Sequence, residues 1–524
     1  MINLQPLRRR EEIPSAHLTT TESWFITSIS AAALGLILAT FRSDGEPLLA
    51  LVALSTLGFA ATFCLIRWAG PSFLAIGLSG EDMSKRQKKT IPEGMGMISA
   101  GVFIMVSCAF LAFGPYLLER NIAQIVGDQI VTTKVEFAPN DNVFYRFPKA
   151  EMLTYLASMV SILVILLLGI GDDVFDFRWR HKIFVPILGV MPTQAAYFVR
   201  GGGTTAVIPT PLQTWFGPTV DLGTFYYVFM IGVSIFMTNS INILAGVNGI
   251  EVSQSLAIAF LLVFNDTLYL FWPDTNPGIY PNPTIEAHLF SIYILLPFIG
   301  VSLALAWHNW FPAKVFVGDS YCYFAGMVFA VVGIFGHFSK TILLLTIPQL
   351  ANFVYSLPQL AKIVPCPRHR LPHFNARTGL MEPSMTLWDD EGPKPLISFV
   401  LKTLDRLYLL RVKTNEEGQI TESSNFTILN LWLVWFGPRR EDRLVIDVVG
   451  LQLATPAYSA LCSTSHLSFM AQTQALSSSP RVWKNTRSVE AARSPLQNLR
   501  RKFCFIDGST VLAMIWGTFI GPGK

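Results

Sequence analysis

The chain has 524 residues, of which 51% are hydrophobic and only 14% are charged, and its formal net charge at pH 7 is +4. Soluble domains carry about 25% charged residues, so this composition excludes an ordinary water-soluble protein. The basic balance belongs to the tail after Leu451, and no nucleic-acid partner is expected. Six scattered cysteines with no Cys-x-x-Cys pair indicate neither a disulfide framework nor a structural metal site. We therefore expect an all-α polytopic membrane protein.

Ten apolar stretches approach the length of about 20 residues that a membrane helix needs. They lie near residues 24–40, 47–66, 95–118, 152–171, 183–199, 223–243, 252–271, 287–307, 321–336 and 341–358. A further apolar region, residues 427–454, is broken by the polar run 438–443 and is either one short span or an interrupted one. The sequence thus predicts ten to eleven transmembrane helices, of which the first is a retained anchor and not a cleaved signal peptide.

The chain divides into three expected regions. Residues 1–46 form an N-terminal extension that carries the extra anchor, and residues 47–450 form the main transmembrane domain with a loop insertion at about 359–426. Residues 451–524 are Ser-rich and basic, which is typical of a disordered tail.

Lysine and arginine in short loops predict the orientation of the spans. The loops 67–94 and 172–182 are both rich in these residues. When the spans are threaded in order, the loops that share their side are 8–10, 67–94, 172–182, 239–251, 308–320 and 359–426. The positive-inside rule assigns this side to the cytosol.

The fourth span ends in charged residues. Asp172 and Asp173 are followed within ten residues by Arg178, Arg180 and Lys182. Acids beside a bilayer are costly and need partners. They are either an interfacial cap on a helix end or, as we prefer, groups that handle a divalent metal and phosphates.

The sixth span ends in a second polar motif on the same side. Asn239 and Asn242 are three residues apart and therefore share a helical face. Gly246 and Gly249 let the backbone approach a ligand closely, and amide oxygens suit Mg²⁺. The alternative is that these amides link neighbouring helices.

Two further motifs complete the set on this side. Asp319, within a Gly-Asp-Ser sequence, is either an N-cap or an oxygen ligand for the same cation. Arg368, His369 and Arg370, held between prolines, form either a guanidinium clamp for anions or ordinary positive-inside charge. The loop that contains Glu81 and Glu93 adds acidic groups.

These motifs, taken in order, resemble a known family. The stretches that carry the resemblance are 172–182, 239–251, 310–327, 332–340 and 355–370. They are similar to the polyprenyl-phosphate N-acetylhexosamine-1-phosphate transferase superfamily, and within it to the eukaryotic enzymes that act on dolichyl phosphate. The match runs from about Pro47 to about Phe436, and the departures from it are the extra anchor and the tail.

The resemblance implies a function. It implies transfer of GlcNAc-1-phosphate from UDP-GlcNAc to dolichyl phosphate, with release of UMP, as the first step of lipid-linked oligosaccharide assembly for protein N-glycosylation. It also implies Mg²⁺ as cofactor, sensitivity to tunicamycin, and a multi-pass location in the endoplasmic reticulum membrane with the active site facing the cytosol. A homodimer in contact with membrane lipid is expected as well.

The resemblance also implies roles for individual residues. Asn242 and Asp319 match magnesium ligands, and Lys182 matches a phosphate contact. The implied substrate-binding residues are Glu81, Asp82, Met83, Glu93 and Asn248 for the nucleotide sugar, Phe316 for uracil, Arg368, His369 and Arg370 for the diphosphate and sugar, and Ile235, Phe236, Met237, Thr238, Asn239, Ser240, Ile241, Asn242 and Ile243 for the lipid phosphate. Gly246 is also expected to contact a substrate.

The acceptor needs little help from a base, because a phosphomonoester has a second pKa of about 6. Asp172 and Asp173 are therefore assigned to positioning the metal, Lys182 or the acceptor, with direct in-line transfer. Two alternatives are less consistent with the sequence. A transporter would place its charges near the membrane midplane, and a bacterial-type enzyme using undecaprenyl phosphate would share the aspartates but not the Arg-His-Arg segment.

Overall fold

The computed structural model describes residues 17–42, 47–86, 88–125, 149–175, 177, 182, 184–208, 215, 217, 219–271, 283–336, 339–367, 370–389 and 392–462. The chain divides into two compact units, residues 1–456 and 457–524, and the description below concerns the first. Its helices are α1 (Thr20–Arg42), α2 (Pro47–Ala75), α3 (Gly96–Ile125), α4 (Lys149–Phe175), α6 (Val185–Val199), α8 (Phe225–Ile243), α9 (Ile250–Phe271), α10 (Pro283–Asn309), α11 (Gly318–Phe335), α12 (Ser339–Leu345), α13 (Ile347–Leu360), α14 (Pro395–Arg406), α15 (Ile428–Phe436) and α16 (Glu441–Cys462).

The strands are short and form small antiparallel sheets outside the long helices. They are β1 (Ser79–Glu81), β2 (Thr90–Pro92), β3 (Thr205–Val207), β4 (Thr219–Asp221), β5 (His373–Asn375), β6 (Leu380–Glu382), β7 (Met385–Leu387), β8 (Val412–Thr414) and β9 (Ile420–Ser424). β1 pairs with β2, β3 with β4 and β5 with β6, and the last three strands form a sheet in the order β7-β9-β8.

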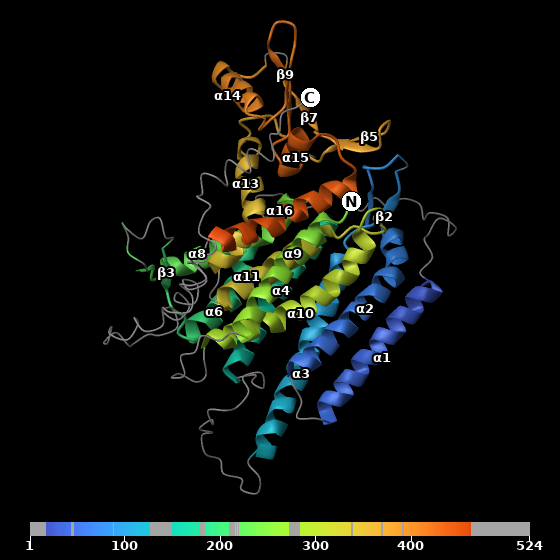
Figure 1. Ribbon diagram of the computed structural model, residues 1–524, viewed down its shortest axis with the longest axis vertical. Helices are drawn as coiled ribbons and strands as arrows, with labels where there is room; N and C mark the ends of the chain where they lie inside the picture. The colour runs from blue at the N-terminus through green and yellow to red at the C-terminus, as the bar shows by residue number, and fades with distance from the viewer. Residues whose placement is uncertain are drawn as a thin grey trace, which may run out of the picture. The chain divides into compact units, whose positions relative to one another are not determined.

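The long helices confirm a polytopic membrane protein. Among the described residues, seven helices are long and apolar enough to cross a membrane, and two shorter helical segments, Gly96–Ala112 and Val185–Val199, are also apolar. Together these segments coincide with nine of the ten predicted spans. The anchor predicted at 24–40 is part of α1, which lies at the outer edge of the bundle beside α2 (Figure 1).

The tenth predicted span, residues 341–358, is not one continuous helix. The chain forms α12 and α13, which are separated at Thr346. Pro348 lies in the first turn of α13, and a proline has no N–H to continue the hydrogen-bond ladder of the preceding helix.

Of the two alternatives for the apolar region 427–454, one short span or an interrupted span, the structure shows an interruption. α15 ends at Phe436, and Gly437, with a φ of +75°, turns the chain before α16 begins. Residues 451–462, which we expected to begin a disordered tail, are helical, because α16 continues to Cys462. Residues 463–524 lie outside the described residues.

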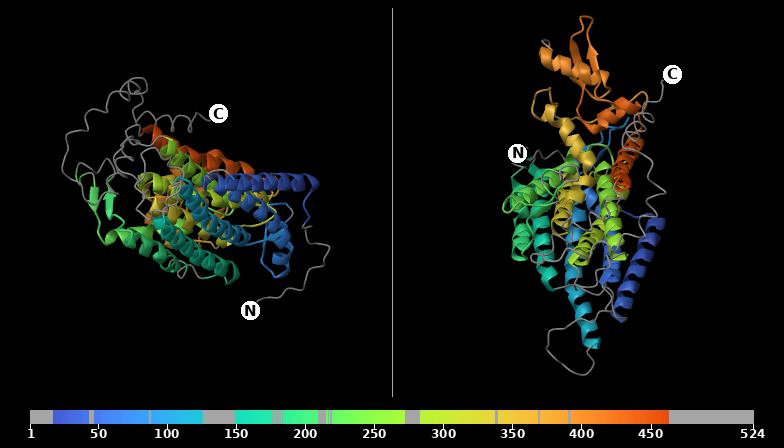
Figure 2. Two further views of the ribbon diagram at one scale, coloured as in Figure 1. Left: turned by 90° about the horizontal axis from the view of Figure 1, so that it is seen from below. Right: turned by 60° about the vertical axis from the view of Figure 1, so that its left-hand side comes forward.

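Helix α11 forms the centre of the bundle. Every residue from Ser320 to Phe335 is buried, and α11 packs against α3, α4, α8 and α10. Figure 2 shows the helix bundle from two further sides. The contact with α8 is close, because a Cβ on Gly326 would lie 2.2 Å from the carbonyl oxygen of Met237. Close packing on several sides gives the first residues of α11 a fixed position.

Three buried glutamines join α9, α13 and α16. The Gln349 amide donates to the side-chain oxygens of Gln254 and Gln452, at 2.8 Å each. The Gln254 amide in turn donates to the carbonyl oxygen of Leu244, at 2.7 Å, just after the end of α8. A buried polar network of this kind specifies how helices align in an apolar interior.

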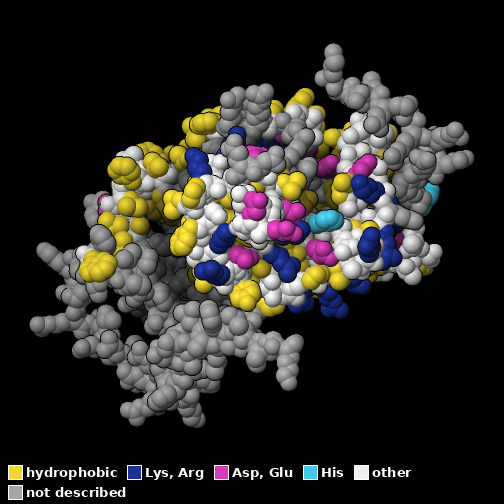
Figure 3. Space-filling view, turned by 90° about the horizontal axis from the view of Figure 1, so that it is seen from above, with side chains coloured by type: hydrophobic (Ala, Val, Ile, Leu, Met, Phe, Trp, Pro, Cys, Tyr) yellow, Lys and Arg dark blue, Asp and Glu magenta, His cyan; other side chains and the backbone are white. Residues whose placement is uncertain are grey.

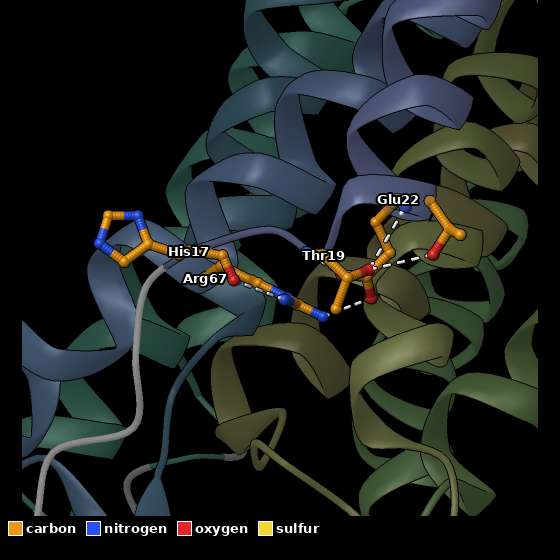
Figure 4. Close-up of polar contacts among 5 residues, drawn as sticks. His17, Thr19, Glu22 and Arg67 are labelled. Carbon is orange, nitrogen blue, oxygen red and sulfur yellow. Dashed lines mark hydrogen bonds and ion pairs between the residues drawn. The ribbon is translucent and has the colours of Figure 1, made fainter.

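The N-terminal helix is fastened to α2 at one end (Figure 4). Thr19 and Glu22 form a capping box, in which the Thr19 backbone N–H donates to Glu22 Oε2 at 2.9 Å and the Glu22 N–H donates to Thr19 Oγ1 at 3.3 Å. The other Glu22 oxygen lies 2.5 Å from Arg67 Nη2. Arg67 also donates to the His17 carbonyl oxygen at 3.0 Å, so one arginine holds the start of α1.

We predict that Arg67→Ala destabilises the protein by about 1.5 kcal/mol, the scale of a partly buried hydrogen bond to a charged group. The side chains of Arg67 and Glu22 are only 15% and 16% exposed. Thermal unfolding in detergent measures the effect. The matched control is Lys413→Ala, because the Lys413 side chain is 60% exposed in its ion pair with Glu422. Equal melting temperatures for the two variants would contradict the prediction.

Candidate active site

The predicted polar motifs meet at the N-terminus of α11. Lys182 Nζ lies 2.7 Å from Asp172 Oδ2 and 3.4 Å from Asp319 Oδ2. The Asn242 amide donates to Asp319 Oδ1 at 2.7 Å. Side chains from α4, α8, α11 and the segment after α4 therefore converge on Asp319.

Asp173 holds the first turn of α11 in place. Its Oδ1 accepts the backbone N–H of Asp319 at 2.6 Å, and its Oδ2 accepts that of Ser320 at 3.2 Å. The first N–H groups of a helix have no partner within the helix, so a carboxylate here satisfies them and complements the helix dipole. The interpretation of Asp319 as only an N-cap is wrong, because the capping carboxylate comes from α4.

A glycine permits this approach of α4 to α11. Gly318 has a φ of +74°, and a Cβ at this position would lie 2.5 Å from Asp173 Oδ2 and 2.7 Å from the Cα of Gly94. Any larger residue would push away the carboxylate that caps the helix.

Lys182 is held between carboxylates. Partial burial opposes its charge, but the hydrogen bond with Asp172 and the negative charges of Asp319 and Asp172 raise the pKa of the Lys182 ammonium. The Asp172 carboxylate is buried, and its second oxygen accepts the backbone N–H of Phe177 at 3.0 Å. Lys182 is therefore a permanent cation beside Asp319.

Glu93 is a further acidic residue influenced by Asp319. Burial, and secondly the charge of Asp319, raise the pKa of Glu93. No group of three or more His, Cys, Asp or Glu side chains within the described ranges is arranged to hold a metal. Magnesium at phosphate-transfer sites, however, commonly uses one or two protein ligands and completes its shell with water and substrate phosphates. The partly exposed carboxylate of Asp319 beside the amide of Asn242 fits such a site.

The hairpin of β1 and β2 borders the acidic cluster. The Phe316 N–H donates to the Pro92 carbonyl oxygen at 2.8 Å, and a Cβ on Gly80 would lie 2.9 Å from the Phe316 ring. The ring therefore lies close to the hairpin backbone at Gly80. Glu81 and Met83 are exposed at the tip side of this hairpin, where a ligand can reach them.

Asp82 is buried and does not face solvent. Its carboxylate accepts the Asn248 amide at 3.0 Å and lies 3.2 Å from Lys85 Nζ. The Asn248 backbone N–H donates to Glu441 at 2.7 Å. The sequence analysis does not identify Glu441 as a site residue. Its one sequence signal is an acidic residue within the apolar region 427–454, and the polar run 438–443 that contains it indicates only an interruption of a membrane span.

The glycines of the Gly246–Gly249 loop adopt backbone angles that favour glycine. Their φ angles are +104° and +89°, and the Gly246 N–H donates to Glu251 at 2.9 Å. Of the two asparagines on α8, only Asn242 reaches Asp319, because the Asn239 amide donates to the Ile235 carbonyl oxygen of its own helix at 2.8 Å.

The segment expected to contact the lipid phosphate is partly buried. Within α8 the buried members are Met237, Thr238, Ser240 and Ile241. Ile235, Phe236, Asn239, Asn242 and Ile243 are partly exposed. A ligand that lies along α8 therefore meets the second group.

Arg370 is the described member of the expected anion clamp, since Arg368 and His369 lie outside the described residues. Burial lowers the pKa of Arg370. Its Nη1 is buried with no hydrogen-bond partner in the part of the chain that the structure covers, while its carbonyl oxygen accepts the Asn430 amide at 2.9 Å. A buried guanidinium nitrogen without a partner is suited to an anionic ligand.

The site lies at one end of the bundle. Acidic and basic side chains gather on the face seen from that end (Figure 3). Arg200, after α6, donates to Thr154 near the start of α4 at 2.9 Å, whereas Asp172 is near the end of α4. Eighteen helical residues span about 27 Å, so the loop after residue 200 lies at the opposite end, as the threading predicted.

Comparisons with known proteins agree with this geometry. Residues 155–337, from α4 to just beyond α11, match glycosyl transferase family 4. The chain is 46% identical over 407 residues to the UDP-N-acetylglucosamine–dolichyl-phosphate N-acetylglucosaminephosphotransferase of Saccharomyces cerevisiae, a match that covers 77% of this chain and 88% of the relative. The relative of the same name from Schizosaccharomyces pombe is 42% identical over 446 residues, or 84% of this chain and 96% of the relative. The chain therefore belongs to the UDP-N-acetylglucosamine–dolichyl-phosphate N-acetylglucosaminephosphotransferases within glycosyl transferase family 4.

Proposed function

We propose that the chain transfers GlcNAc-1-phosphate from UDP-GlcNAc to dolichyl phosphate, giving dolichyl-diphospho-GlcNAc and UMP. The observation that carries the proposal is the convergence of Asp172, Lys182, Asn242 and Asp319 in a chain whose relatives bear the name of this reaction. A transporter is not favoured, because these charged groups lie at helix ends on one side and not at mid-span.

The proposed reaction is a direct displacement at phosphorus. An oxygen of dolichyl phosphate forms a bond to the phosphorus that carries GlcNAc, and the bond from that phosphorus to the bridging oxygen breaks. UMP leaves with the bridging oxygen and its electron pair. Two anions must be brought together and aligned, and positioning with electrostatic screening dominates catalysis of this kind.

The residues around the N-terminus of α11 have different roles in this reaction. Lys182 contacts phosphate oxygens and screens their charge, and Asp172 orients its ammonium group at 2.7 Å. Asp173 fixes the backbone that carries Asp319. No general base is assigned, because the acceptor phosphate, with a second pKa of about 6, is already largely dianionic at neutral pH.

Asp319 and Asn242 would hold Mg²⁺. When bound, the ion would neutralise charge on the diphosphate of the donor. The donor itself is assigned to the neighbouring loops, with uracil on the ring of Phe316, the sugar and ribose beside Glu81, Met83 and Asn248, and the diphosphate at Arg370 together with Arg368 and His369. The acceptor is assigned to the partly exposed face of α8.

The remaining expectations are part of the same proposal. The chain would reside in the endoplasmic reticulum membrane with the site facing the cytosol, and α12–α13 together with α15–α16 would bring the number of spans to ten or eleven. The lysine and arginine bias of loops 67–94 and 172–182 supports this orientation. Assembly as a homodimer stays a prediction.

The direct test of the reaction is UMP release by purified protein. We expect release that requires both UDP-GlcNAc and Mg²⁺, and a kcat/KM that is higher with dolichyl phosphate than with undecaprenyl phosphate. Absence of UMP release by folded protein would overturn the proposed function. A preference for undecaprenyl phosphate would replace it with the bacterial type of reaction.

We predict that Asp319→Ala lowers kcat by about a hundredfold or more, because loss of one group that stabilises charge in a transition state commonly has an effect of this size. The variant should remain folded, since the Asp319 carboxylate is partly exposed and its backbone N–H still reaches Asp173. Steady-state kinetics at saturating Mg²⁺, with a melting curve for each protein, give the answer. Activity within a fewfold of the unchanged chain would remove Asp319 from the site.

Orientation can be tested with single cysteines placed at the two ends. In a chain stripped of its six native cysteines, we expect Lys413→Cys to react with an impermeant thiol reagent in sealed microsomes, because the Lys413 side chain is 60% exposed in the loop assigned to the cytosol. Cysteine at Val220, exposed in β4, should be protected until detergent opens the membrane. The reverse pattern would place the site in the lumen, away from a cytosolic nucleotide sugar.

A further inference from the structure

Glu441 lies where α16 meets two loops of the site. It is only 3% exposed, and its Oε1 accepts the backbone N–H of Asn248 at 2.7 Å. Its Oε2 lies 2.5 Å from the ammonium of Lys85. One carboxylate thus joins the loop after α8 to the loop between β1 and β2.

The same two loops are also joined without Glu441. Asp82 accepts the Asn248 amide at 3.0 Å and lies 3.2 Å from Lys85. Asp82, Lys85, Glu441 and Asn248 form a closed ring of bonds, which includes the Asn248 backbone N–H, and Lys85 is the shared cation of the two buried carboxylates. The Lys85 ammonium also lies 4.6 Å from the centre of the Phe311 ring, a contact that attracts a cation.

Glu441 is placed by packing that is independent of these bonds. Leu444, Val445 and Val448 of α16 are buried in one cluster with Leu244, Val247 and Ile250, which flank the loop after α8. One turn farther along α16, Gln452 joins the buried glutamine network. The start of α16 is therefore anchored against the loop that Glu441 contacts.

The loop after α8 is held from two sides. The Gly246 N–H donates to Glu251 of α9 at 2.9 Å, and the Asn248 N–H donates to Glu441 of α16 at 2.7 Å. Glycines with positive φ at both ends of the loop leave its backbone with few intrinsic constraints. The two carboxylates supply the constraint that the loop sequence lacks.

We propose that Glu441 is a positioning residue for the nucleotide-sugar donor, which sets the Asn248 loop and, through Lys85, the β1–β2 hairpin in the geometry that binds UDP-GlcNAc. The inference rests on the proposed function, which assigns these two loops to the donor. Glu441 itself touches no substrate. The acceptor surface on α8 and the Asp172–Lys182 pair lie outside this ring of bonds.

Removing the charge of Glu441 should affect the donor alone. Glu441→Gln keeps an oxygen for the Asn248 N–H but leaves Asp82 as the remaining charged partner of Lys85, which is partly buried at 19% exposure. The Lys85 ammonium then moves toward Asp82 and away from the start of α16. The hairpin that carries Lys85 then shifts relative to the Asn248 loop.

The test is steady-state kinetics of the full chain with each substrate varied in turn. We expect Glu441→Gln to raise the KM for UDP-GlcNAc about tenfold, equivalent to one lost charge-assisted hydrogen bond. The KM for dolichyl phosphate should stay within about twofold, because uniform binding of one substrate is what has been lost. A role in stability alone would not separate the two KM values.

Asp442→Asn is the matched control. Asp442 is the next residue on the same helix end, but its carboxylate pairs with the nearby Arg440 and not with either loop. Its KM values should equal those of the unchanged chain. If Glu441→Gln does not fold, Lys85→Met tests the ring from the hairpin side, and the same rise in donor KM is expected.

The double variant Lys85→Met with Glu441→Gln provides a further check. Because the double variant removes both charges, its KM for UDP-GlcNAc should rise by a smaller factor than the product of the two single-variant increases. Unchanged donor KM in folded Glu441→Gln, or an equal rise in both KM values, would overturn the inference. The proposed function fails separately, if the unchanged chain releases no UMP from UDP-GlcNAc.

Discussion

The carboxylate of Asp173 at the N-terminus of α11 is the interaction on which the rest of the site depends. It satisfies two backbone N–H groups that the helix cannot satisfy itself, and it thereby fixes Asp319 relative to α4. The end of α4 that carries Asp173 also carries Asp172, which positions Lys182. Gly318 and the buried packing of α11 make this approach possible. Adjacent aspartates thus have separate tasks, since one orients a cation and the other orients a helix.

The membrane arrangement could be predicted from the sequence because its signal is local. A run of apolar residues of the right length is enough to predict a span, and loop charges predict which ends lie together. The contacts between Lys182 and Asp319 and between Asp82 and Asn248 confirm that the predicted loops share one end. The sequence did not reveal the break within 341–358, where Pro348 interrupts the hydrogen bonds of the helix. Apolar composition does not report such backbone details.

The types of the site residues could be predicted, but their pairings could not. Sequence spacing puts Asn239 and Asn242 on one face, yet which of the two reaches Asp319 depends on the rotation of α8 against α11, set by contacts such as that of Gly326 with Met237. Asp82 was expected as a substrate contact, and the fold instead buries it against Asn248 and Lys85. Glu441 is nearly two hundred positions from Asn248 in sequence, and no local pattern relates two residues so far apart.

These bonds divide the site into two parts, the groups around Asp319 and the loops assigned to the donor. The groups around Asp319 lie at or just beyond the ends of α4, α8 and α11, helices whose positions are fixed by buried packing. The loops assigned to the donor are short, contain glycines with positive φ, and depend on carboxylates contributed by α9 and α16. Preorganised charged groups are most effective where a phosphoryl group is transferred and charge develops in the transition state. A loop that binds and releases a nucleotide sugar instead benefits from a small number of specific constraints. The bonds of Glu441 are such constraints, and they make the last helix of the bundle part of donor recognition although it contributes no side chain to the reacting groups.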